Sequence, residues 1–102
     1  MDIYESIIDK IVNALDEIED NIKHHKKEKE SILEDLNSIT KIAMNTKDFF
    51  KIMYSRGPNS VDSEGISKEK AMLLLTQISQ CIERCAFLKA ITFTLDWYIY
   101  LY

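Results

Sequence analysis

Cys81 and Cys85 are the residues whose type and spacing come closest to known site chemistry. Zinc sites usually place paired cysteines two residues apart in a turn and take further ligands from a second pair. Here the two cysteines are four residues apart in a segment that predicts a helix, and the chain has no other cysteine. Both fall on an apolar helical face, where thiols pack as small hydrophobic groups. We therefore expect structural thiols, no metal and no cofactor, with a redox or intersubunit role as the alternative.

The two histidines, His24 and His25, are adjacent and so point about 100° apart on a helix. No helical metal motif surrounds them, and no local signature of a Ser-His-Asp or Cys-His nucleophile is present. Asp96 is unusual because it falls in the most apolar part of the chain, where a carboxylate requires a partner such as Arg84 or Lys89. These patterns predict a protein that is not an enzyme.

The elements that would position these residues are helices. The chain has 102 residues with only two glycines and one proline, too few breakers for the frequent turns of a β or α/β fold. We therefore expect a single all-α domain over residues 1–102 with coiled-coil-like packing. Apolar residues of the first half follow one heptad register, at Ile8, Ile11, Leu15, Ile18, Ile22, Ile32, Leu36, Ile39, Ala43, Phe50 and Met53.

The lysine-rich segment 23–31 leaves two alternatives open. The first half is either one helix over residues 3–54 or two helices that meet near 23–31. A break is supported by Ser31 and Glu34, which form a capping-box pattern. Continuity is supported by the absence of glycine and proline and by the good helix propensity of lysine and glutamate. We favour continuity, because the heptad register survives across the segment.

Residues 56–66 contain both glycines and the proline and predict the one clear loop, with Arg56 at its start. Ser67 is a suitable N-cap for a last helix over 67–102. Its apolar seam also has heptad spacing, at Ala71, Leu74, Ile78, Cys81, Cys85, Leu88, Thr92, Leu95, Ile99 and Tyr102.

Helix lengths separate two architectures. The last helix would be roughly 54 Å long and a continuous first helix roughly 80 Å, which leaves roughly 25 Å of one arm unpaired in an antiparallel hairpin. Dimerisation would cover that arm. A break near 23–31 would instead allow a closed three-helix bundle. The expected fold is therefore a long-helix hairpin or a three-helix bundle, completed in the first case by a dimer.

The aromatic end of the last helix is the best candidate for an interface. Tyrosine and tryptophan bury a large area with few rotamers and dominate many protein interfaces. We expect truncation after Leu88 to abolish assembly. The candidate interface residues are Phe87, Ile91, Phe93, Trp97, Tyr98, Tyr100, Leu101 and Tyr102.

Charge narrows the class of partner. The net charge is −4 and acids are concentrated near the start of the chain, which argues against nucleic acid and favours a basic protein partner. The acidic start predicts no leader peptide, the apolar end is short for a membrane span, and two cysteines suggest a cytoplasmic setting. The candidate partner-binding residues are Asp9, Asp16, Glu17, Asp20 and Arg56.

These patterns favour a non-catalytic interaction protein, such as a small adaptor, chaperone or inhibitor, acting as a helical dimer or as a subunit of a complex. The alternative is a monomeric immunity or regulatory bundle that binds and neutralises a toxin or an enzyme through its acidic surface.

Overall fold

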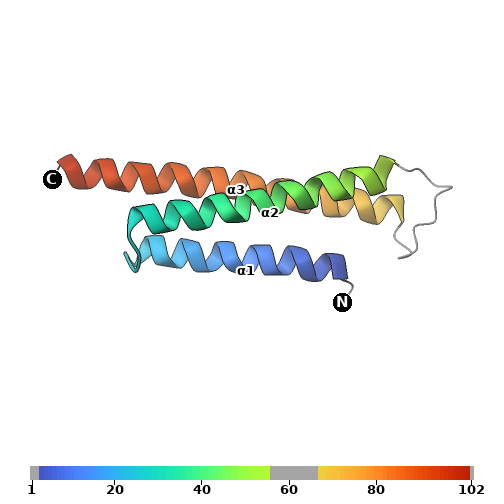
Figure 1. The fold of residues 1–102 in the computed structure, drawn as a ribbon, viewed down its shortest axis with the longest axis horizontal. Coiled ribbons are helices and arrows are strands. Elements are labelled where there is room, and N and C mark those ends of the chain that lie inside the picture. The colour runs from blue at the N-terminus through green and yellow to red at the C-terminus, as the bar shows by residue number, and fades with distance from the viewer. Residues whose placement is uncertain (1–2, 56–66, 102) are drawn as a thin grey trace.

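The protein is a bundle of three helices in which each helix runs antiparallel to the one before it (Figure 1). The computed structural model describes residues 3–55 and 67–101, with side chains up to Thr94. Helix α1 spans Ile3–Lys23, α2 spans Lys29–Ser55 and α3 spans Lys68–Leu101. The predicted all-α class is therefore confirmed, and the described residues contain no strand. The predicted loop at 56–66 lies outside the described residues.

The core lies along the seam that the heptad spacing predicts. Leu15, Leu36, Leu74 and Ile78 are completely buried. On α3 the predicted seam is buried from Ala71 to Thr92 at every position, and its later positions lie outside the described side chains. The three helices share this one core, which consists of Tyr4, Ile8, Ile11, Leu15, Ile18, Ile22, Ile32, Leu36, Ala43, Phe50, Leu74, Ile78, Cys81, Cys85 and Leu88.

The prediction of a continuous first helix is wrong, because the chain turns between Lys23 and Lys29. His25 adopts a left-handed backbone conformation with φ of 50°. Its N–H donates to the carbonyl of Ile22 at 3.4 Å, and the Lys26 N–H donates to the carbonyl of Asn21 at 3.0 Å. These two bonds form the Schellman motif that ends many helices, with histidine at the position that glycine usually occupies.

The turn has a simple energetic origin. The segment between the helices is polar and exposed, so an extended helix through it would bury no apolar side chain. Folding back instead packs Ile32, Leu36 and Phe50 of α2 against the core. Burial of each such side chain stabilises the fold by roughly 1.5–3 kcal/mol, so the three together outweigh the cost of about 1–2 kcal/mol for one left-handed residue.

The start of α2 also differs from its prediction. The Ile32 N–H donates to the carbonyl of Glu28 at 3.0 Å, so the helix begins before Ser31 and the predicted capping box does not form its end. The predicted cap of α3 is confirmed, because the Lys70 N–H donates to Ser67 Oγ at 3.1 Å.

Candidate interaction surfaces

The first candidate surface is the C-terminal part of α3. Lys29, the first residue of α2, places its Nζ 4.9 Å from the centre of the Phe93 ring. Residues 94–101 of α3 therefore continue past the start of α2, and Figure 1 shows this end projecting beyond the turn between α1 and α2. Eight helical residues correspond to roughly 12 Å. This part of α3 has no neighbouring helix among the described elements.

The side chains before this projection are already partly uncovered. Phe87 is 61% exposed and Phe93 is 54% exposed, while Ile91 is half-buried against the core. The predicted interface residues Trp97, Tyr98, Tyr100, Leu101 and Tyr102 lie outside the described side chains. The described part of the predicted interface thus presents two aromatic rings to solvent beside the projecting end.

The second candidate surface is the acidic face of α1, which is largely neutralised within the chain. Arg84 Nη2 of α3 lies 2.7 Å from Asp16 Oδ1 and 3.3 Å from Glu19 Oε2. Burial alone lowers the pKa of Arg84, but the hydrogen bonds and charges of Asp16 and Glu19 outweigh it and raise that pKa. The guanidinium of Arg84 thus links α3 to α1, and it neutralises Asp16, which is one of the predicted partner-binding acids.

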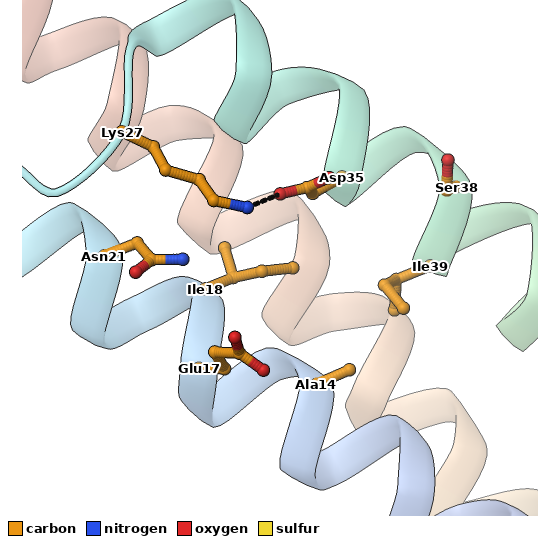
Figure 2. A pocket seen from close by; sticks show the side chains of 8 residues that line it. All are labelled: Ala14, Glu17, Ile18, Asn21, Lys27, Asp35, Ser38 and Ile39. Carbon is orange, nitrogen blue, oxygen red and sulfur yellow. Dashed lines mark hydrogen bonds and ion pairs between the residues drawn. The ribbon is translucent and has the colours of Figure 1, made fainter.

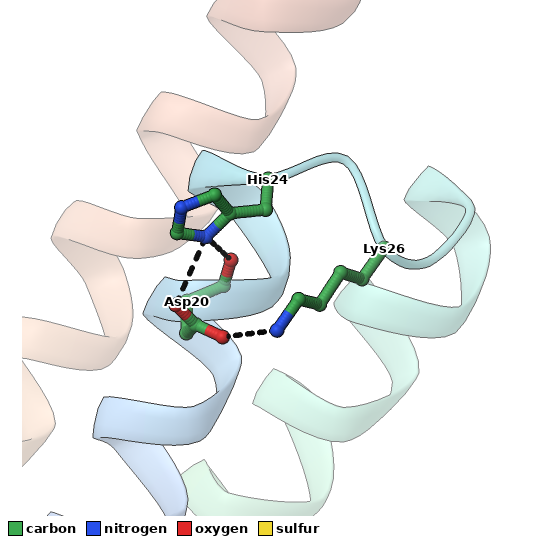
Figure 3. Close-up of polar contacts among 3 residues, drawn as sticks. All are labelled: Asp20, His24 and Lys26. Carbon is green, nitrogen blue, oxygen red and sulfur yellow. Dashed lines mark hydrogen bonds and ion pairs between the residues drawn. The ribbon is translucent and has the colours of Figure 1, made fainter.

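Asp20, near the end of α1, also forms ion pairs within the chain (Figure 3). Lys26 Nζ lies 2.7 Å from Asp20 Oδ2, and His24 Nδ1 lies 2.9 Å from Asp20 Oδ1. The hydrogen bond from Lys26 is the largest cause that lowers the pKa of Asp20. The carboxylate therefore holds the turn together. Asp9 and Glu17 are exposed and form no ion pair within the described part of the chain, and Arg56 lies outside it.

A small pocket lies between α1 and α2, beside Glu17 (Figure 2). Its volume is about 230 Å³, below the roughly 300–1,000 Å³ of typical small-molecule sites. An ion pair joins Lys27 Nζ and Asp35 Oδ2 at 3.1 Å on its rim. Both apolar and polar side chains line it, namely Ala14, Glu17, Ile18, Asn21, Lys27, Asp35, Ser38 and Ile39.

A larger trough of about 610 Å³ runs between α2 and α3. Met72, Gln80 and Glu83 on its sides are exposed, and Leu75 is half-buried. Ligand sites for small molecules enclose most of the ligand surface. An open trough of this kind fits a protein surface better than a small molecule.

The thiols of Cys81 and Cys85 are buried, as the sequence predicts for structural cysteines, and they form no disulfide bond. Burial is the main cause that raises the pKa of Cys81, and the neighbouring Cys85 adds to it. Among the described residues, no group of three or more histidine, cysteine, aspartate or glutamate side chains could hold a metal ion.

The sequence did not predict the pocket residues that the turn between α1 and α2 brings together. Asn21, Lys27 and Asp35 meet at one pocket only because the chain reverses between them. It also missed exposed apolar side chains on α2, including Ile42, Phe49 and Ile52, which alternate with the buried seam. A second apolar stripe beside a heptad seam is the signal that could have found them.

Comparison with known proteins identifies no relative. No family model, curated protein or solved structure matches this chain. Within the described residues, none of the helices combines the length and hydropathy needed to cross a bilayer.

Proposed function

We propose that this protein is a non-catalytic interaction module that binds another protein chain through the C-terminal part of α3, as a dimer or as a subunit of a complex. The observation that carries the proposal is the contact between Lys29 and Phe93, because α3 continues beyond it without a neighbouring helix among the described elements. A helix needs an apolar partner for most of its stability.

The composition of the projecting end supports a protein partner. Residues 95–101 consist of leucine, aspartate, tryptophan, two tyrosines, isoleucine and leucine. Tryptophan and tyrosine are enriched among the residues that dominate binding energy at protein interfaces. The exposed rings of Phe87 and Phe93 extend the same surface toward the bundle. Burial of each ring against a partner would contribute roughly 1.5–3 kcal/mol.

Charge supports the choice of a basic partner. Asp9 and Glu17 are the predicted partner-binding acids that keep exposed carboxylates without an intramolecular ion pair in the described residues. Such charges accelerate association with a complementary partner more than they increase its final affinity. We therefore propose that the aromatic end of α3 is an anchor that provides most of the binding energy and that Asp9 and Glu17 favour a basic partner.

The test is light scattering coupled to size exclusion, applied to the full chain and to a variant that ends at Thr94. This variant keeps Ile91 and Thr92, which pack in the bundle, whereas truncation after Leu88 would remove them. We expect the full chain to form a dimer or a larger species at micromolar concentration and the variant to be monomeric. Circular dichroism checks that the variant keeps its helices.

Two results would count against the anchor. One is a shortened variant that assembles as the full chain does. The other is a full chain that stays monomeric and whose binding to a partner protein is unchanged by the truncation. That partner would be captured from cells, and its binding would be confirmed by titration of the purified pair.

The second candidate function is a monomeric regulator that neutralises a toxin or an enzyme through its acidic surface. The closed core favours it, because Leu15, Leu36 and Ile78 from the three helices are completely buried without a second chain. A monomeric full chain at all concentrations, with partner binding that falls steeply as salt rises, would favour this function over the dimer.

A further inference from the structure

The pocket between α1 and α2 has a composition that indicates its ligand. Glu17 and Asp35 contribute two carboxylates, and Lys27 contributes one ammonium group. The charged side chains that line it therefore sum to one negative charge. Because the Lys27–Asp35 pair is 44% and 39% exposed, solvent screens it and a competing cation can share Asp35.

Asn21 shows that the pocket is built to receive a polar group. Only 9% of this residue is exposed, and its side chain points between the two helices (Figure 2). In the described part of the chain, no protein group forms a hydrogen bond with this side-chain amide. No side-chain nitrogen or oxygen there is both fully buried and without a partner, so the amide of Asn21 is accessible to solvent. Rotation of the amide exchanges its oxygen and nitrogen, so it can offer either an acceptor or donors to a ligand.

The walls of the pocket suit an aliphatic stem. Ala14 and Ile18 of α1 face Ile39 of α2, and Figure 2 shows these side chains around the same space as Glu17. A long side chain with a terminal charge would place its methylene groups against these residues and its charge near the carboxylates. The volume of about 230 Å³ suits one such side chain better than a cofactor.

We propose that this pocket binds a cationic side chain of the protein partner, arginine in preference to lysine. The guanidinium would pair with Glu17, share Asp35 with Lys27 and donate to the Asn21 amide oxygen. Arginine is favoured because its planar group donates along several directions to carboxylates, whereas an ammonium acts as a point charge. This inference rests on the proposed function insofar as the ligand is part of a protein partner.

The test uses the full chain and a small probe, N-acetyl-arginine amide, followed by the amide resonances of the isotope-labelled protein. We expect saturable shifts around Glu17, Asn21 and Asp35, including the side-chain amide of Asn21. The neutral isostere N-acetyl-citrulline amide should produce no saturable shift. The lysine analogue should bind more weakly than the arginine probe.

A matched pair of variants provides the control. Glu17→Gln removes a pocket charge, and we expect it to weaken binding of the arginine probe about three- to fivefold. Asp48→Asn removes one carboxylate charge from an exposed position of α2, outside the pocket lining. It should leave binding unchanged within about twofold. The amide spectrum of each variant checks that its fold is intact.

Three results would overturn the proposal: no saturable shift, equal shifts from arginine and citrulline probes, or equal weakening by Glu17→Gln and Asp48→Asn. The last would mean that only the general negative charge of the protein attracts the probe. Because the probe requires neither a dimer nor an identified partner, its result is independent of the truncation test. Arginine binding by a monomeric chain would retain the pocket and reject the aromatic anchor.

Discussion

The ammonium nitrogen of Lys29 and the ring of Phe93 lie 4.9 Å apart, and this contact defines the level at which the bundle changes from three helices to one. A cation over an aromatic face at an exposed site is worth about 0.5–1 kcal/mol. The contact thus links the first residue of α2 to the last turn of α3 that packs against another helix.

Phe93→Ala should therefore destabilise the monomeric bundle, and Phe87→Ala serves as its matched control. Both rings are more than half exposed on α3, but the described contacts place a cation only over Phe93. We expect the free energy of unfolding to fall by about 0.5–1 kcal/mol for Phe93→Ala and to change by less than about 0.5 kcal/mol for Phe87→Ala. Urea denaturation at low protein concentration measures both values. Equal losses would mean that the cation contributes nothing.

His25→Gly should stabilise the protein. His25 has φ of 50°, a conformation that costs an L-residue about 1–2 kcal/mol and costs glycine little. Glycine also gains entropy in the unfolded chain, which offsets about 0.5–1 kcal/mol of that benefit. We expect a net gain of about 0.5–1 kcal/mol in urea denaturation. His24→Gly is the control, and it should give no gain because His24 contributes its ring to Asp20.

The helical segments could be predicted from the sequence, while the turn between α1 and α2 could not. Every described seam position on α3 is buried because heptad spacing puts these residues on one face, and that relation needs no knowledge of neighbours. The turn at His25 has no glycine, and the lysines and glutamates around it propagate helices well. Its cause is the burial of Ile32 and Leu36 after the chain reverses, which is a property of the whole fold.

The candidate surfaces likewise have features that the sequence predicts and features that only the packing of the helices reveals. The sequence indicates that α1 is acidic, but only the packing of α3 beside it reveals that Arg84 pairs with Asp16. The sequence likewise contains Asn21 and Asp35, yet their shared pocket exists only because of the turn. Roles for the aromatic residues beyond Thr94 remain predictions from their types and spacing.

Asp20→Asn should reduce the dependence of the free energy of unfolding on pH at acidic pH. Interactions with Lys26 and His24 lower the folded-state pKa of Asp20 below its ordinary value of 3.8. A group with a depressed pKa contributes stability that is fully present above the unfolded value and is lost as pH falls through the folded value. We therefore expect the difference between the natural chain and Asp20→Asn to disappear as pH falls below about 3.8. The urea midpoint between pH 2 and 6 measures this, with Asp9→Asn as control. A difference that persists at the lowest pH would argue against the ion pairs.

The cysteines should react slowly in the native protein. Cys81 is 5% exposed and Cys85 is 1% exposed, so a reagent reaches either thiol only when the bundle opens. The raised pKa of Cys81, caused mainly by burial, further reduces the reactive thiolate at neutral pH. We expect iodoacetamide to label both thiols at least about tenfold more slowly in buffer than in urea, as followed by mass spectrometry. Cys81→Ser then reports Cys85 alone. Rapid labelling of one thiol in buffer would instead support a redox or intersubunit role, because a reactive cysteine must be accessible and ionised.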